Sequence, residues 1–312
     1  MFYFAKKDFL LKAIIDLGTN TFHLYIAEVK ANTLHEYYKM QIPVKLGKGG
    51  INNGEITSDA FRRGLTALHE FAKYIERFQV KDIQAFATSA IRNASNGNQF
   101  IEEAHRQFGI PIQAISGDVE AGFIYRGVNH SFKFPDETVL VMDIGGGSVE
   151  LIIGKQQNIL WKQSFEIGAA RLIDLFHHEN PISSSEVEAL TAYLTEKLKP
   201  AVEACEKYNP QIFIGAAGSF ETLLDVVIND LAVIPLSLSK HAYEIRREDF
   251  DVFVEIMKTG TQAQREKLKG MVSFRVEMIT VAALLMQFAV EQFQIKRIIC
   301  SDYSLKEGVL FS

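Results

Sequence analysis

Residues 139–154 read Val-Leu-Val-Met-Asp-Ile-Gly-Gly-Gly-Ser-Val-Glu-Leu-Ile-Ile-Gly. Two apolar runs flank a turn with three consecutive glycines, which predicts a strand, a tight turn and a second strand. Glycines let a backbone approach a ligand closely and can direct several N–H groups into one concavity that holds a phosphate. We expect the phosphate contacts of this turn to come from Gly145, Gly146, Gly147 and Ser148.

A carboxylate lies on each side of this turn. Asp143 ends the first predicted strand, where it is placed to hold a hydrated divalent cation, and Glu150 follows the turn. A phosphate cradle between two carboxylates predicts a site for phosphate chemistry.

The pattern recurs near the start of the chain. Residues 13–27 read Ala-Ile-Ile-Asp-Leu-Gly-Thr-Asn-Thr-Phe-His-Leu-Tyr-Ile-Ala, again an apolar strand, Asp-x-Gly, small polar residues and an apolar strand. Asp16 precedes Asp143 by 127 residues, which predicts duplicated domains that each begin their sheet with a phosphate-binding hairpin. Two such cradles facing one another would define a cleft, with phosphate contacts from Thr19, Asn20 and Thr21.

Length and charge narrow the class of protein. The 312 residues suggest about two domains, and 47% apolar content is enough for two cores. The net charge of −5 argues against a general nucleic-acid or membrane-surface binder. The two cysteines, Cys205 and Cys300, form no metal-ligand pattern. The first 15 residues make a poor signal peptide, and the apolar run at residues 278–290 is too short to span a bilayer. These features predict a soluble cytoplasmic protein.

Strands and helices alternate along both halves, which predicts layered α/β domains at residues 1–130 and 131–312. In the first half we expect a helix from Thr57 or Ser58 to Phe78, a polar loop at 88–97 and a helix at 99–108. In the second half, helices are expected at 186–208, 247–258 and 275–293. A third glycine turn, Gly215-Ala-Ala-Gly-Ser219, precedes another helix that Ser219 is expected to cap.

Three charged side chains outside the hairpins are candidates for the site. Glu120 lies in the first turn of a helix that follows a strand, where the ligand sites of such sheets gather, although it could simply favour the helix dipole. Arg92 lies in the polar loop and could clamp an anion or be solvated. Arg171, near another helix N-terminus, could also meet an anion. His23 is expected to be buried against its sheet rather than to act as a base.

With both hairpins placed, the chain resembles the exopolyphosphatase and guanosine pentaphosphate phosphohydrolase family, within the acetate kinase, sugar kinase, heat-shock protein 70 and actin superfamily. Six motifs carry the resemblance in family order, at residues 16–21, 88–96, 116–121, 143–150, 167–172 and 301–308. The resemblance implies two ribonuclease-H-like domains flanking a central cleft, with a final helix at about 301–312 that packs back onto the first domain.

The resemblance also implies an activity and roles for residues. It implies Mg²⁺-dependent hydrolysis of the terminal phosphoanhydride of inorganic polyphosphate, or of the 5′ γ-phosphate of guanosine pentaphosphate, by a homodimer. Glu120 matches the glutamate that activates water, Glu150 the second carboxylate of the site, and Asp143 the metal-associated aspartate. Positioned donors, a cation and a water-orienting carboxylate are what phosphoryl transfer requires.

Two rival interpretations keep the same hairpins. An ATP-dependent small-molecule kinase would need an adenosine pocket, which residues 215–219 only half supply. A non-catalytic sensor of polyphosphate or guanosine tetraphosphate would have little use for carboxylates beside a phosphate, because they repel it unless a cation intervenes.

Overall fold

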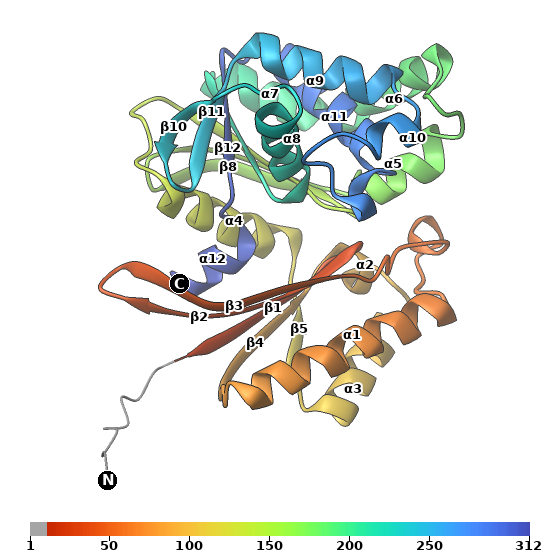
Figure 1. The fold of residues 1–312 in the computed structure, drawn as a ribbon, viewed down its shortest axis with the longest axis vertical. Helices are drawn as coiled ribbons and strands as arrows, with labels where there is room; N and C mark the ends of the chain where they lie inside the picture. Colours follow the sequence, from red (N-terminus) through yellow and green to blue (C-terminus); the bar gives the residue numbers. More distant parts are fainter. Residues whose placement is uncertain (1–10) are drawn as a thin grey trace.

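The computed structural model describes residues 11–312. It contains two mixed β-sheets with their helices, one above the other in Figure 1. Within this range, no helix combines the length and apolar character needed to cross a bilayer. Cys205 and Cys300 are both buried free thiols. The signal-peptide prediction for residues 1–15 falls largely outside the described residues.

The first half builds a five-stranded sheet in the order β3-β2-β1-β4-β5. Its strands are β1 (Lys12–Leu17), β2 (Thr21–Lys30), β3 (Thr33–Pro43), β4 (Asp82–Ala87) and β5 (Ile112–Ala114). β2 pairs antiparallel with β1 and β3, whereas β4 is parallel to β1 and β5. The face away from the second sheet is covered by α1 (Ser58–Arg77) and α3 (Gly97–Phe108) (Figure 1).

Local sequence explains the helices of this half. Thr57 caps α1 by accepting a 3.4 Å hydrogen bond from the N–H of Ala60, and the apolar stripe with Leu68 and Phe71 packs into the core beneath the sheet. The helix predicted there is confirmed. The loop predicted at 88–97 is wrong in part, because α2 (Ser89–Arg92) forms one helical turn there.

The second half builds a seven-stranded sheet in the order β10-β11-β12-β9-β6-β7-β8. Its strands are β6 (Val139–Ile144), β7 (Val149–Lys155), β8 (Asn158–Phe165), β9 (Ile212–Ala216), β10 (Leu236–Ser239), β11 (Ala242–Ile245) and β12 (Arg297–Ser301). The five strands β8-β7-β6-β9-β12 repeat the order and directions of the first sheet. Two ribonuclease-H-like units are thereby confirmed as the fold class.

Helices of the second half lie mostly over the sheet face away from the first half (Figure 1). They are α5 (Ala169–Phe176), α6 (Ser184–Lys197), α7 (Lys199–Tyr208), α8 (Gly218–Asn229), α9 (Arg247–Thr259), α10 (Gln262–Arg265) and α11 (Ile279–Gln292). The single helix predicted at 186–208 is wrong: it breaks at Leu198, because Pro200 in the next turn cannot donate a backbone hydrogen bond. The helix predicted at 275–293 starts later, after the 3₁₀ turns η2 (Ser273–Arg275); η1 (Ile51–Asn53) is the other such turn.

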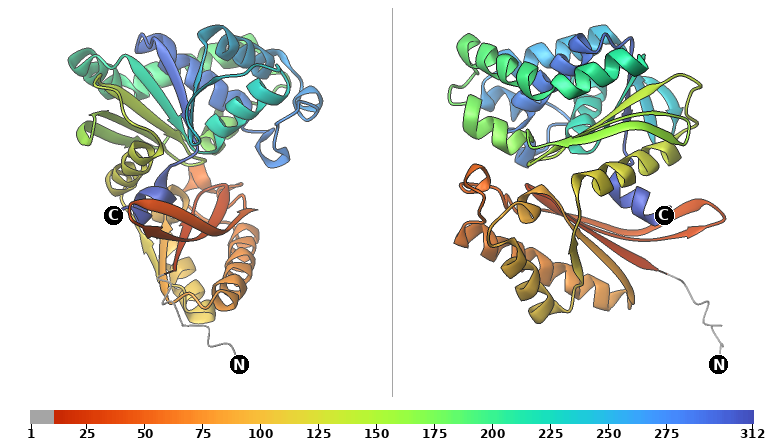
Figure 2. Two further views of the ribbon diagram at one scale, coloured as in Figure 1. Left: turned by 60° about the vertical axis from the view of Figure 1, so that its left-hand side comes forward. Right: turned by 180° about the vertical axis from the view of Figure 1, so that it is seen from behind.

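Two helices join the halves. α4 (Gly117–Ser131) lies between the two sheets, and the last helix, α12 (Leu305–Leu310), crosses back to pack on α4 and β1 (Figure 2). A core cluster shared by both sheets surrounds them; its members include Ile14, Tyr25, Ile124, Val139, Ile152 and Val309. The domain boundary near residue 130 stays a prediction.

Glycines allow α4 and α12 to touch backbone to backbone. A Cβ at Gly127 would lie 2.0 Å from the carbonyl oxygen of Ser304, and one at Gly308 would lie 1.8 Å from that of Phe123. Neither clash can be relieved by a side-chain rotation, because each involves backbone atoms.

We predict that Gly127→Ala destabilises the protein while Gly122→Ala, in the same helix, does not. The first overpacks the crossing, at a cost of about 1–3 kcal/mol or more. At Gly122 the nearest atom to an added Cβ is the Lys162 Nζ at 3.7 Å, so the helix propensity of alanine dominates. Thermal unfolding midpoints of the two variants measure the difference, and equal midpoints would show that the crossing is loose.

Candidate active site

The two glycine turns meet face to face. A Cβ at Gly147 would lie 2.5 Å from the hydroxyl oxygens of both Thr19 and Ser89, and one at Gly146 would lie 3.1 Å from the Cβ of Thr19. The loops of the two halves are therefore in direct contact at these points. The central cleft that the sequence predicts between the two hairpins is confirmed.

The hairpins are duplicated in atomic detail. In each turn, the glycine that follows the aspartate donates to the carbonyl three residues on: Gly18 to Thr21 at 3.2 Å and Gly145 to Ser148 at 3.0 Å. In the strand registers, Asp16 pairs with His23 and Asp143 pairs with Glu150. His23 therefore takes the place in the first hairpin that Glu150 takes in the second.

Hydrogen bonds hold the carbonyls of the second turn and leave its amides free. The N–H groups of Gly168, Ala169 and Ala170, where α5 begins, donate to the carbonyls of Gly147, Gly145 and Gly146 at 2.8–3.2 Å. The amides of Gly146 and Gly147 donate to no group among residues 11–312. Free amides on a turn that lines the cleft form an anion-binding nest.

The first turn is tied down in the same way. The carbonyl of Asn20 accepts from the N–H groups of Val44 and Lys45 at 2.9 and 2.7 Å, and that of Thr19 accepts from Gly47 at 3.1 Å. The Thr19 hydroxyl oxygen is buried and has no hydrogen-bond partner among the described residues. Buried polar groups usually have a hydrogen-bond partner, so this hydroxyl is a candidate donor to a ligand in the cleft.

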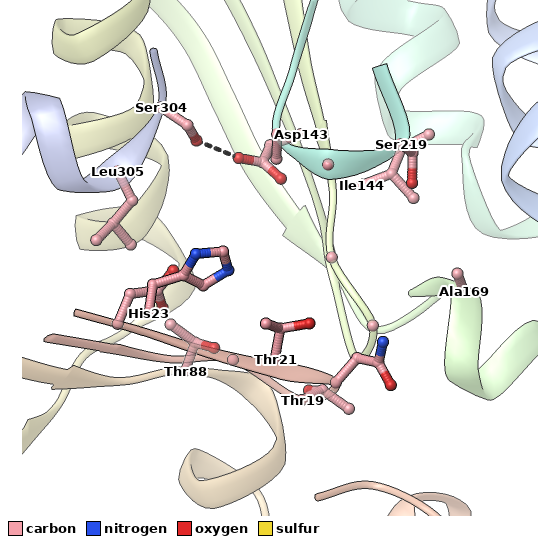
Figure 3. Close-up of a pocket in the computed structure, with 18 of the residues that line it drawn as sticks. Thr19, Thr21, His23, Thr88, Asp143, Ile144, Ala169, Ser219, Ser304 and Leu305 are labelled. Atoms are coloured by element: carbon pink, nitrogen blue, oxygen red, sulfur yellow. Dashed lines mark hydrogen bonds between the residues drawn. The ribbon is translucent and has the colours of Figure 1, made fainter. Parts of the chain in front are cut away.

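Most of the residues predicted for the site line this cleft. They are Thr19, Asn20, Thr21, Glu120, Asp143, Gly145, Gly146, Gly147, Ser148 and Glu150, and Asp16 lies among them. Figure 3 shows Asp143 on one side of the cleft, with Thr19, Thr21 and His23 on the other. The structure brings these groups together; their roles stay predictions.

Four carboxyl groups in the cleft have raised pKa values. Burial raises the pKa of Asp16 to about 6, that of Asp143 to about 7, and that of Glu150 to about 8, in the last case with help from the charge of Asp143. Burial, and then the charge of Glu150, raises the pKa of Glu120 well above its usual value. Four carboxylates so close together need protons or a cation to offset their repulsion.

Two of these groups are held by hydroxyls. Ser304, just before α12, donates to Asp143 (dashed in Figure 3), and Ser164 on β8 donates to Glu150 at 2.6 Å. Because Asp143 and Glu150 are cross-strand partners, they can offer oxygens to one cation. In the described part of the chain no three His, Cys, Asp or Glu side chains are grouped to hold a metal. The pair fits Mg²⁺, which usually takes one or two carboxylates and keeps waters or substrate phosphates.

Glu120 enters the cleft from the first turn of α4. Ser116 caps this helix by accepting from the N–H of Val119 at 3.3 Å, so the turn that carries Glu120 is well defined. The Glu120 carboxylate accepts a 2.9 Å hydrogen bond from Arg92. Burial makes the ionised Glu120 carboxylate a stronger base than a solvated one, which suits it to accept a proton from water.

Neither predicted anion-binding arginine lines the cleft. Arg92 lies behind Glu120 and also donates to the Ile115 carbonyl at 3.1 Å and to Glu166 at 3.0 Å. Its contact with a phosphate stays a prediction. Arg171 donates from all three of its guanidinium nitrogens to protein acceptors, and it does not line the cleft, so its contact with an anion stays a prediction.

Lys306 is a cleft residue that the sequence did not single out. It lines the cleft from the first turn of α12, and its ammonium has no hydrogen-bond or ion-pair partner within residues 11–312. Burial works to lower its pKa, but the charges of Glu307, Asp16 and Glu221 outweigh this and raise it. Only the return of α12 to the first half brings this lysine to the site, which local sequence does not reveal.

The third glycine turn differs from its prediction. Ala217, with φ +64°, is the N-cap of α8, and Ser219 lies inside the helix, so the expected Ser219 cap is wrong. Ser219 lines the cleft instead. Arg275 lies against this turn, donating to the Gly218 carbonyl and to Glu221.

His23 also lines the cleft; burial lowers its pKa well below the usual value, which keeps it neutral.

Comparison with known proteins agrees with this geometry. The profile of the Ppx/GppA phosphatase family matches residues 25–312. A putative exopolyphosphatase of Haemophilus influenzae is 27% identical over 300 residues, covering 96% of this chain and 90% of that protein. The crystal structure of an exopolyphosphatase from Cytophaga hutchinsonii superposes with a TM-score of 0.92 at 37% identity, over 96% of both chains. The Aquifex aeolicus PPX-GPPA enzyme superposes with a TM-score of 0.78 at 27% identity, over 96% of this chain and 98% of that one. The chain belongs to the Ppx/GppA phosphatase family.

Proposed function

We propose that this protein is an exopolyphosphatase, a phosphoanhydride hydrolase that releases terminal orthophosphate from inorganic polyphosphate. The observation that carries the proposal is the pair of opposed turns with free amides, beside a cluster of carboxylates in the same cleft. Opposed donors can enclose a terminal phosphoryl group from two sides, and a carboxylate can direct water onto it. The names of its relatives support this substrate class.

We assign the terminal phosphate to the two turns. The free amides of Gly146 and Gly147 and the unpartnered Thr19 hydroxyl would donate to its oxygens, with Asn20, Thr21, Gly145 and Ser148 completing the cradle. Lys306 would donate to a phosphate oxygen. Its ammonium lines the cleft and forms no ion pair with a carboxylate among the described residues. Charge-assisted hydrogen bonds of this kind are about twice as strong as neutral ones.

Glu120 is proposed as the base. It would take a proton from water as the water oxygen bonds to the terminal phosphorus and the bridging P–O bond breaks, leaving a polymer shorter by one phosphate. Glu150 is the second carboxylate, held by Ser164 so that it can orient the water or a cation. Asp143 and Glu150 would hold Mg²⁺, which neutralises the charge of the phosphates and carboxylates when bound.

The alternatives fit the cleft less well. The kinase hypothesis needs an adenosine pocket at the third glycine turn, but Arg275 packs against Gly218 there, and the Phe220 ring lies where a Cβ of Gly215 would be. The sensor hypothesis does not explain why four carboxyl groups lie in the cleft, since carboxylates repel a phosphate unless a cation intervenes. Guanosine pentaphosphate presents the same terminal anhydride and remains the alternative substrate. A cytoplasmic homodimer that binds neither nucleic acid nor membranes stays part of the proposal.

We predict that Glu120→Gln lowers kcat for phosphate release by about 10²–10⁴-fold, because the amide cannot accept the proton of water. Polyphosphate binding, measured by calorimetry, should stay within about threefold of wild type because the cradles are untouched. Glu103→Gln, at an exposed ion pair with Arg106, is the control. Wild-type turnover by the Glu120 variant would rule it out as the base.

Mg²⁺ affinity should rise with pH between about 6 and 9. Metal ligands must be deprotonated, and the pKa values of Asp143 and Glu150 are raised to about 7 and about 8, so protons compete with the cation below those values. Calorimetric titration at pH 6 and pH 9 measures this, with proton release expected near neutral pH. Equal affinities at both values, or full affinity in Asp143→Asn, would place the metal elsewhere.

Lys306→Met should weaken substrate binding. The variant keeps the length of the side chain but removes the free ammonium, so we expect KM for polyphosphate to rise by roughly tenfold or more. The salt dependence of KM should become shallower at the same time, because one fewer cation meets the polyanion. Lys197→Met, on the exposed face of α6, is the control. A KM that does not change in the Lys306 variant would contradict the assignment.

A further inference from the structure

Glu166 lies just beyond β8 and joins three side chains from both halves of the protein. Its carboxylate accepts from the Ser89 hydroxyl at 2.6 Å and from Arg92 at 3.0 Å, both from the first half. It also accepts from Arg171 of α5, at 3.0 Å. The Glu166 side chain is 42% exposed, whereas those of Arg92 and Arg171 are only 16% and 13% exposed.

On one side, this carboxylate sets the orientation of Arg92. The guanidinium is planar, so a contact at one nitrogen fixes the plane of the whole group. Arg92 donates a hydrogen bond from Nη2 to Glu166 at 3.0 Å and one from Nη1 to Glu120 at 2.9 Å. Glu166, together with the Ile115 carbonyl that accepts from Arg92 at 3.1 Å, therefore fixes the direction from which the Arg92 guanidinium meets the proposed base.

On the other side, Glu166 orients Arg171. That guanidinium donates to the Gly147 carbonyl at 2.9 Å and, across the halves, to the Ile51 carbonyl at 2.8 Å. One unbroken path of hydrogen bonds thus runs from Glu120 through Arg92, Glu166 and Arg171 to the second glycine turn. Two arginines face two carboxylates along it, so their charges balance.

We infer that Glu166 is a positioning residue: through Arg92 it aims Glu120, and through Arg171 it holds the Gly147 turn at a fixed distance from Glu120. The inference rests on the proposed function, since it concerns the alignment of base and phosphate cradle. Glu166 does not line the cleft and touches no substrate in this account. Its carboxylate is ionised at neutral pH, because hydrogen bonds from Ser89, Asn93 and Arg92 outweigh burial and lower its pKa.

The variant that tests this is Glu166→Gln, which keeps the shape and removes the charge. We expect kcat to fall by roughly 10- to 100-fold with KM changed by less than about threefold, since misalignment of a base costs turnover more than binding. With Glu166 neutral, Glu120 is the carboxylate that remains to pair with Arg92, so we expect the ionised form of Glu120 to gain and the acid limb of the pH profile of kcat/KM to move to lower pH. Glu166→Asp, which keeps the charge, should leave that limb in place.

A double-mutant cycle separates positioning from a purely structural role. If Glu166 acts through Arg92, Glu166→Gln should cost much less in the Arg92→Ala background than in the wild type. Glu255→Gln, at an exposed pair with Lys258, is the matched control and should match wild type throughout. Wild-type kcat and an unmoved acid limb in Glu166→Gln, or fully additive effects in the cycle, would overturn the inference.

An assay of the wild-type protein distinguishes failure of the positioning role from failure of the proposed function. Phosphate release by the wild type with normal kinetics in Glu166→Gln refutes the positioning role alone. Absence of phosphate release from polyphosphate by the wild type refutes the proposed function. Thermal unfolding of each variant shows whether a lost activity reflects lost folding. If Glu166→Gln does not fold, Glu166→Asp decides the question, because a moved acid limb in that variant, which keeps the charge, would overturn the inference.

Discussion

The structure depends on the close approach of two glycine turns from opposite halves of the chain. Only residues without a Cβ can bring the second turn this near to Thr19 and Ser89, where an added atom would lie 2.5 Å from both hydroxyls. Hydrogen bonds from α5 and from the segment after β3 hold the turn carbonyls, so the free amides are left to the cleft. The anion cradle is thus a property of the pair of halves, and neither half builds it alone.

Electrostatics then determine what this cradle can do. Donors alone would make a phosphate-binding site, but Asp16, Glu120, Asp143 and Glu150 add four acidic groups whose pKa values are raised chiefly by burial, and for the last three also by the charge of another member of the group. Such a cluster accommodates a polyanion only with a cation present, and in the proposed mechanism it also supplies the base. Lys306 and the Arg92–Glu166–Arg171 contacts offset part of the remaining charge.

Much of this arrangement could be predicted from sequence because it is local. The Asp-x-Gly turns give their strands, their register and their ligand-facing groups within a few residues, and the duplication implies two similar sheets. The positions of two charged side chains depend instead on longer-range contacts. The direction of Arg92 depends on Glu166, 74 residues away, and Lys306 reaches the cleft only because α12 returns to α4. Ser219 looked like a cap, but the backbone turn at Ala217 places the helix start earlier.

A crystal structure with Mg²⁺ and a non-hydrolysable polyphosphate analogue tests the central claim most directly. The account predicts a terminal phosphate between the two turns, with its oxygens within hydrogen-bond distance of the amides of Gly146 and Gly147 and of the Thr19 hydroxyl. It also predicts Glu120 facing the terminal phosphorus opposite the bridging oxygen. An analogue bound with its terminal phosphate away from both turns, or with Glu120 remote from it, would contradict the account.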